Sequence, residues 1–372
     1  IGSEAVDFIR YPEGAGMSVT KTTQNVFTAT LSGNTAGWFT IPGDPGPIGL
    51  VLGLEYLEIK SRIDTPEFIE KDEFLGFSLS PASMDAQVDT TSIFSEALIP
   101  LISGKPGIDF LELELGFRSL DHSTTGRSNT SKLALAYYPT EDFQFRASYN
   151  KAVRAPALDE LYRNQKINWL YLGDPCTDAD QFKSVGNQAT ASSILLAASP
   201  ELTNTCLATG VPVENLYDEQ FARNFAVPIN QGGAGGGLLP EDAKTYSVGV
   251  VWTPYSIDGL SVSFDYFQVE IENYIETSPF DPDGLMIACY DPSSTSGGAG
   301  SKACNSISRD PSGGVASLFT GYQNLGLHTL EGWDINLSYG LEFFKGFLDI
   351  NYFATKISKR TIEDDSYGDI NF

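Results

Sequence analysis

The sequence has few of the residues that build metal, redox or catalytic sites. It contains only two histidines, His122 and His328, and its four cysteines include no CxxC pair. Structural zinc sites and redox dithiols need such closely spaced ligands. Neither histidine lies near a plausible nucleophile motif, so we expect no enzyme activity, no bound metal and no cofactor.

Positive charge is also scarce. Lysine and arginine together number 23, whereas aspartate and glutamate number 48, which gives a formal net charge of −25 at pH 7. Such a chain repels nucleic-acid phosphates, so a nucleic-acid partner is not expected. The acidic residues should instead keep exposed loops soluble.

Long apolar runs are absent as well. No run reaches the roughly eighteen residues of a transmembrane helix. The chain starts at Ile1 without an initiator methionine or signal peptide, which suggests a mature chain or an excised piece. A membrane location stays open, because the strands of a β-barrel alternate apolar with polar residues and never form such runs.

The chain is rich in aromatic residues and glycine, with 17 Tyr, 23 Phe and 36 Gly, a mixture that favours β-structure with many turns. In Asp142–Lys151, Phe143 and Phe145 share one face while Gln144 and Arg146 share the other. The same period of two predicts about ten strands: Val26–Leu31, Ile48–Tyr56, Ile93–Leu101, Phe110–Ser119, Lys132–Tyr138, Asp142–Lys151, Lys244–Thr253, Leu260–Tyr266, Gly332–Tyr339 and Leu348–Ala354. We expect apolar residues such as Phe143, Phe145, Val248, Val250 and Leu337 on an outer face, and Glu114, Arg146 and Asp334 on an inner one.

The predicted connections alternate between short and long. Short turns follow the strands that end near Leu101, Tyr138, Trp252 and Tyr339. The others are long: 61–89, 120–130, 153–241 and 275–322. This alternation is typical of an antiparallel up-and-down transmembrane β-barrel whose short turns face the periplasm. An open sheet of about ten strands would leave bare edges in lipid, so we expect a partial barrel that further strands complete.

Several stretches resemble TonB-dependent outer-membrane receptors. They are Leu111-Glu-Leu-Glu-Leu-Gly-Phe-Arg118, the segment Phe145–Tyr162 with its Arg154-Ala-Pro and Glu160-Leu elements, Leu239–Pro254, Leu260–Phe267 and Glu331–Tyr339. The matches run from about residue 90 to residue 355 in family order. The family's N-terminal plug, its energy-coupling box and its closing strands find no match. We therefore expect residues 1–372 to be one partial barrel domain without the plug.

The resemblance implies a location and an activity. Such receptors lie in the outer membrane of Gram-negative bacteria and import a scarce, large nutrient with force from the TonB complex. The implied partners are outer-membrane lipid, the plug, TonB and a nutrient: a ferric siderophore, cobalamin or an oligosaccharide. The charge of −25 favours a neutral ligand such as an oligosaccharide. A non-energised porin or a surface adhesin remains the alternative.

Five residues are candidates for ligand contact: Arg118, Arg146, Arg154, Trp169 and Tyr171. Arg154 either touches the ligand or fixes the exit from strand to loop through charge-assisted hydrogen bonds. Trp169 and Tyr171 either stack on a sugar or an aromatic chelate, or pack within their loop.

The four cysteines allow three pairings. Because Cys176 and Cys206 share one long connection, and Cys289 and Cys304 share the next, we expect two local disulfides in an oxidising compartment. The bridges either preshape a ligand mouth or protect exposed loops from proteolysis. A bridge between the two connections would mean that both loops form one cap.

Overall fold

The structure is a computed structural model of the 372-residue chain. It describes residues 18–43, 45–67, 83–163, 166–171, 174–176, 199–217, 226–231, 233, 237–277, 282–292, 297–363 and 370–371.

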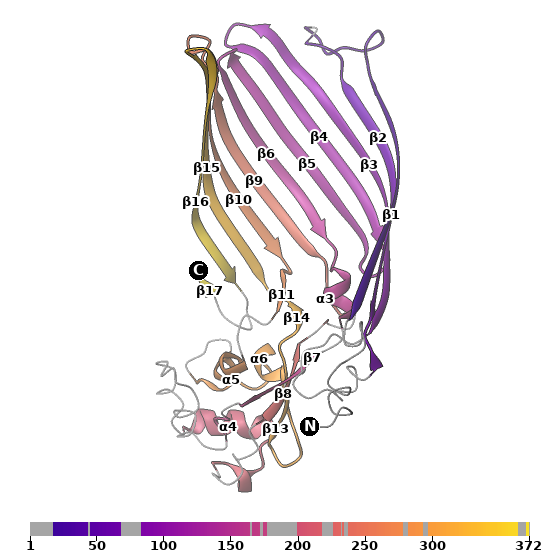
Figure 1. The fold of residues 1–372 in the computed structure, drawn as a ribbon, viewed down its shortest axis with the longest axis vertical. Coiled ribbons are helices and arrows are strands. Elements are labelled where there is room, and N and C mark those ends of the chain that lie inside the picture. Colours follow the sequence, from indigo (N-terminus) through magenta and orange to yellow (C-terminus); the bar gives the residue numbers. More distant parts are fainter. Residues whose placement is uncertain are drawn as a thin grey trace, which may run out of the picture.

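A single large antiparallel sheet forms most of the molecule (Figure 1). Its ten long strands confirm the predicted number and fold class, and a two-residue strand is added at one edge. The strands, in spatial order, are β1 (Val19–Asn34), β2 (Gly49–Asp64), β3 (Met84–Lys105), β4 (Ile108–His122), β5 (Gly126–Thr140), β6 (Phe143–Arg154), β9 (Glu241–Trp252), β10 (Leu260–Glu272), β15 (Leu327–Phe343), β16 (Gly346–Glu363) and β17 (Ile370–Asn371). Among the described residues β1 does not pair with β17, so the curved sheet is open.

The strands are longer than hydropathy predicts, and two expected loops shrink. The prediction of a long connection at 120–130 is wrong, because β4 continues to His122 and β5 begins at Gly126. Likewise β2 runs to Asp64 and β3 starts at Met84, which shortens the connection expected at 61–89. Beyond Leu120, β4 ends and β5 begins with polar residues on both faces, so no apolar alternation marks these ends. At the start of β3, by contrast, Met84, Ala86 and Val88 alternate with polar residues, and the predicted strand left this segment out.

The register separates an apolar face from a polar face. Phe145 lies opposite Val250, which lies opposite Phe264; one residue along, Arg146 lies opposite Gly249. Phe145 and Val248 are exposed on the apolar face, whereas Glu114, Arg146 and Asp265 line a hollow of about 490 Å³ on the polar face. The predicted segregation of the two sides is thus confirmed, and the hollow identifies the polar face as the concave one.

The two rims of the sheet differ. One rim carries the turns after β3, β5, β9 and β15, together with the 35–48 connection between β1 and β2. Gly104 and Gly107 adopt positive φ values of 65° and 76° at the tight turn between β3 and β4. The opposite rim carries the two longest connections between described strands, β6 to β9 and β10 to β15.

Both long connections contain ordered structure. The first holds α3 (Leu158–Tyr162), β7 (Lys166–Tyr171), α4 (Pro200–Ala208), a 3₁₀ turn (Val213–Asn215) and β8 (Ala226–Gln231). The second holds β11 (Ile275–Thr277), α5 (Pro282–Tyr290), α6 (Lys302–Asn305), β12 (Ile307–Arg309), β13 (Val315–Phe319) and β14 (Tyr322–Asn324). No described helix is long and apolar enough to cross a bilayer.

The two connections fold together beyond the rim of the sheet, as Figure 1 shows. A four-stranded sheet in the order β12-β13-β8-β7 takes two strands from each connection. We call the described parts of residues 166–231 and 282–319 the cap. The β11–β14 ribbon, which we call the neck, joins the second connection to the strands of the large sheet.

Candidate functional site

The concave face presents arginines and lysines that are paired with carboxylates. Arg118 on β4 contacts Glu55 on β2 and donates to Ser92 Oγ at 2.7 Å. Lys132 on β5 contacts Glu114 on β4. Arg146 on β6 donates to both carboxylate oxygens of Asp265 on β10, at 2.8 and 2.7 Å. Each of these cations is therefore neutralised by a carboxylate from another strand of the sheet.

A cluster of four residues ties together the roots of both long connections. Arg154, the last residue of β6, donates to Glu241, the first residue of β9, at 2.5 and 2.9 Å. The same guanidinium binds Glu160 of α3 at 2.9 and 3.0 Å. Glu241 is 6% exposed and also accepts the backbone N–H of Ile275 at 2.7 Å. We call Arg154, Glu160, Glu241 and Ile275 the root cluster.

Asn324 makes a second tie at the neck. Its amide nitrogen donates to the carbonyls of Leu239 and Asn273, at 3.0 and 2.7 Å. Its side-chain oxygen accepts the N–H of Leu239 at 2.8 Å. These bonds join the end of the first connection to both ends of the second, so the position of the cap is fixed by polar contacts at its base.

Two disulfides lie in the cap. Cys176 bonds to Cys206 and Cys289 bonds to Cys304, which is the local pairing that the sequence predicts. The buried core nevertheless crosses between the connections: it joins Cys176, Leu202 and Cys206 of the first to Leu285, Met286, Cys289 and Tyr290 of the second. The two loops therefore form one cap without a disulfide between them.

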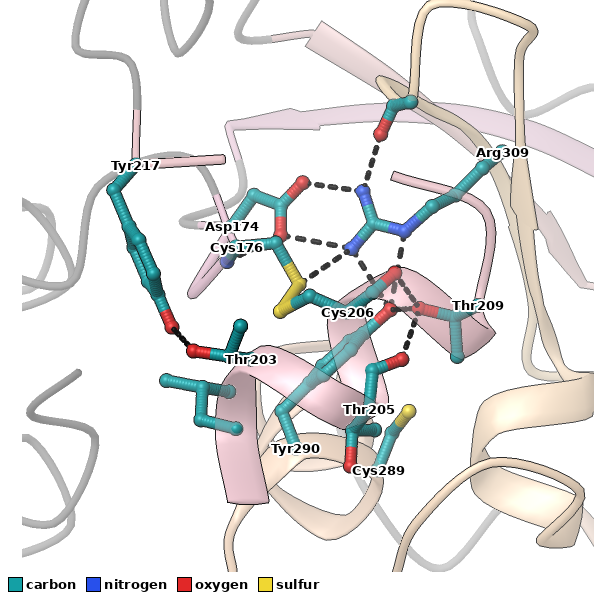
Figure 2. Close-up of a disulfide and its surroundings, with 12 residues drawn as sticks. Asp174, Cys176, Thr203, Thr205, Cys206, Thr209, Tyr217, Cys289, Tyr290 and Arg309 are labelled. Atoms are coloured by element: carbon teal, nitrogen blue, oxygen red, sulfur yellow. Dashed lines mark hydrogen bonds and ion pairs between the residues drawn. A yellow bond between two sulfur atoms is a disulfide. The ribbon is translucent and has the colours of Figure 1, made fainter. Parts of the chain in front are cut away.

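A buried ion pair also crosses between the connections, as Figure 2 shows. Arg309 binds both carboxylate oxygens of Asp174, at 2.6 and 2.9 Å, and the arginine side chain is only 2% exposed. The Tyr290 hydroxyl accepts from Arg309 at 2.8 Å and shares a 2.9 Å hydrogen bond with Thr209. Full pairing of this kind is what makes a buried charge tolerable.

Burial acts in opposite directions on the pKa values of Arg309 and Tyr290. Burial by itself lowers the pKa of Arg309, but the hydrogen bonds and the charge of Asp174 more than offset this, so the net pKa lies above its usual range. Burial raises the pKa of the Tyr290 phenol, although the nearby Arg309 pulls it down. At physiological pH, Arg309 is thus a cation and the Tyr290 phenol beside it is neutral.

The five candidate ligand residues are spread over three places. Arg118 and Arg146 lie on the concave face, and Arg154 lies in the root cluster. The contacts of Arg154 support its alternative role at the exit from strand to loop. Trp169 and Tyr171 belong to β7 in the cap, and their side chains lie outside the described residues.

The sequence did not reveal Asp265 and Glu241 as the partners of Arg146 and Arg154, nor the pairing of Arg309 with Asp174. Asp265 is 119 positions from Arg146, and Arg309 is 135 positions from Asp174. Only a known strand register or loop packing could have joined them. Within the described part of the chain, no group of three or more His, Cys, Asp or Glu side chains is placed to hold a metal ion.

Solved receptors share the fold. A point mutant of the ferric enterobactin receptor of Pseudomonas aeruginosa is 17% identical over 91% of this chain and 36% of that chain, with a TM-score of 0.50. The siderophore receptor PirA of Acinetobacter baumannii is 16% identical over 93% and 38% of the two chains, with a TM-score of 0.50. The hemophore receptor HasR of Serratia marcescens is 13% identical over 94% and 44%, with a TM-score of 0.52.

The chain thus spans well under half the length of these receptors. No curated protein matches it. The family model of the TonB-dependent receptor-like β-barrel matches residues 5–371. The chain therefore belongs to this family of outer-membrane β-barrel transport receptors, which are not enzymes.

Proposed function

We propose that this chain supplies barrel wall and extracellular cap to a receptor in a Gram-negative outer membrane. The receptor captures a scarce, large nutrient and imports it with force from TonB. One observation carries the proposal: the sequence matches the family over 5–371, and the two longest connections between described strands fold into one cap on one rim of the wall. This difference between the rims fits a barrel that has short turns on the periplasmic side and long ligand-binding loops on the extracellular side.

The nutrient is either a ferric chelate or an uncharged molecule such as an oligosaccharide. The solved receptors named above are described as ferric enterobactin, siderophore and hemophore receptors, which supports the first. The paired cations Arg118, Lys132 and Arg146 support the second, because a cation already neutralised by a carboxylate adds little attraction for an anionic chelate. Cobalamin is a third nutrient to test.

Uptake by cells carrying the full-length gene tests this function. A deletion strain, the complemented strain and a complemented strain without TonB would each receive labelled ferric enterobactin, haem, cyanocobalamin or maltooligosaccharides. We expect saturable uptake of one of these nutrients, lost when either the receptor or TonB is deleted.

The alternatives give different results. A diffusion porin would give uptake that persists without TonB and rises linearly with concentration. An adhesin would change surface attachment but no uptake. Either result would overturn energised import.

A further inference from the structure

A hollow of about 600 Å³ lies at the cap end of the concave face. Its floor is formed by Leu57 and Ile59 of β2 and Val88 of β3, which the register places side by side. One wall is the segment Arg154–Asp159 that leads from β6 into α3. The hollow therefore opens next to the root cluster, at the mouth of the barrel.

The apolar floor borders a polar group on the side away from the cap and an apolar cluster on the side of α3. Immediately below it on the same face lie Glu55, Ser92 and Arg118, joined by hydrogen bonds. The adjoining apolar residues Ile63, Met84 and Ala86 are covered by Leu158 of α3, with which they form a buried cluster. Val88 belongs to the same buried cluster and Ile59 packs against it, but Leu57 and Ile59 remain partly exposed. Apolar surface left open to water in a wet lumen is characteristic of a binding site.

The charged groups at the rim of the hollow already have partners. Arg154 is held between Glu160 and Glu241, and Asp159 pairs with Arg163. His122 also lines the hollow, and its Nδ1 is hydrogen-bonded to the hydroxyl of Thr124 at 2.9 Å. The remaining polar lining consists of the hydroxyl side chains of Thr22, Ser61 and Thr90.

We propose that this hollow is a subsite for an uncharged aromatic ring of the imported nutrient. An apolar floor would take the face of the ring, and the hydroxyls would hydrogen-bond to its polar substituents. The rim offers no unpaired charge among the residues that line it, so an anionic ring gains nothing there. This inference rests on the proposed function and narrows its substrate class.

The test measures binding of simple probes to the purified full-length receptor by saturation-transfer NMR. The probes are phenyl β-glucoside, methyl β-glucoside, which lacks the phenyl ring, and benzoate, which carries a charge. Ala157→Trp fills the hollow from an exposed position, and Ile59→Asn makes its floor polar. The matched control is Val213→Trp, at a cap position that is 72% exposed.

We expect saturable binding of phenyl β-glucoside, about tenfold or more weaker in Ala157→Trp and Ile59→Asn and unchanged in Val213→Trp. Thermal unfolding of each variant separates this loss from misfolding. Ala157→Trp reduces the volume of the hollow and Ile59→Asn does not, so a loss of binding in both variants has no common cause in volume. Three results would overturn the subsite: no saturable binding by the unmodified receptor, binding by both hollow variants as tight as that by the unmodified receptor, or binding of benzoate or methyl β-glucoside as tight as that of phenyl β-glucoside.

The uptake assay described under the proposed function, carried out on the same receptor, separates this inference from that function. TonB-dependent uptake without probe binding would refute the subsite and leave the receptor function standing. Probe binding without TonB-dependent uptake would refute energised import and leave the subsite standing.

Discussion

Arg146 on β6 reaches Asp265 on β10 by crossing β9, the strand between them. The crossing passes over Gly249, which lies opposite both residues in the sheet register. A Cβ atom at position 249 would come within 1.9 Å of the Asp265 carboxylate. The glycine thus allows an ion pair between strands that are not neighbours, and it ties three strands of the wall together.

Gly249→Ala should therefore destabilise the barrel. The added methyl group forces the Asp265 carboxylate away from Arg146, and we expect a loss of about 1–3 kcal/mol, typical of overpacking. Urea unfolding of the full-length receptor in detergent, followed by tryptophan fluorescence, measures the change. Gly33→Ala is the control, because a Cβ there meets nothing within 4 Å. Equal effects of the two substitutions would contradict the role of Gly249.

Arg309→Met should open the cap. The substitution leaves Asp174 buried without its cation, which costs about 3–5 kcal/mol. Hydrogen exchange should show lost protection in α4 and α5 and unchanged protection in β4 and β5. Arg62→Met is the control, because Arg62 and Asp64 form an ion pair in which both side chains are exposed, and such a pair contributes little to stability.

The double variant Arg309→Met, Asp174→Leu sharpens this test. Removing both charges should recover most of the lost stability, because no unpaired charge remains in the core. A double variant as unstable as the single one would show that the buried charge is not the cause.

Removing both disulfides should loosen the cap without unfolding the wall. On the chain-entropy model each bridge contributes about 3–4 kcal/mol. The variant Cys206→Ser, Cys304→Ser should therefore be cleaved by protease within the cap while the barrel stays intact. In the unmodified protein, peptide mapping without reductant should yield Cys176 linked to Cys206 and Cys289 linked to Cys304. A peptide that links Cys176 to Cys289 or to Cys304 would refute the pairing.

Glu241→Ala should free the base of the cap. The change removes two hydrogen bonds from Arg154 and leaves the N–H of Ile275 without its acceptor. We expect about 1–3 kcal/mol less protection from hydrogen exchange at β11 and the start of β9. Glu272→Ala is a suitable control, because Glu272 is half-exposed and its pair with Lys244 lies on the outer face. Equal loss of protection at the neck in both variants would argue against the root cluster.

This 372-residue chain on its own should depend on detergent. The large sheet exposes apolar side chains such as Leu52, Leu54, Phe117 and Val248. Within the part of the chain that the structure describes, each of its two edge strands has a neighbour on one side only. Size-exclusion chromatography with light scattering should find aggregates in plain buffer and a defined particle in detergent. A monodisperse monomer in plain buffer would contradict the membrane assignment of the outer face.

The sequence by itself determined the wall. Period-two alternation located all ten long strands and assigned Phe145 and Arg146 to opposite faces, because successive side chains of a strand point to opposite sides. It could not locate the ends of β4 and β5, where the residues on both faces are polar and hydropathy carries no information. The family motifs near Arg154 pointed to the root of a loop but not to its partners.

Only the tertiary structure decided the cap and its contacts. The two cysteine pairs are local, yet the buried core and the Arg309–Asp174 pair join loops that are distant in sequence. The hollow beside α3 likewise depends on how Arg154–Asp159 lies across β2 and β3. Such contacts arise from packing between separate segments, and local spacing in a single sequence carries no record of which segments meet.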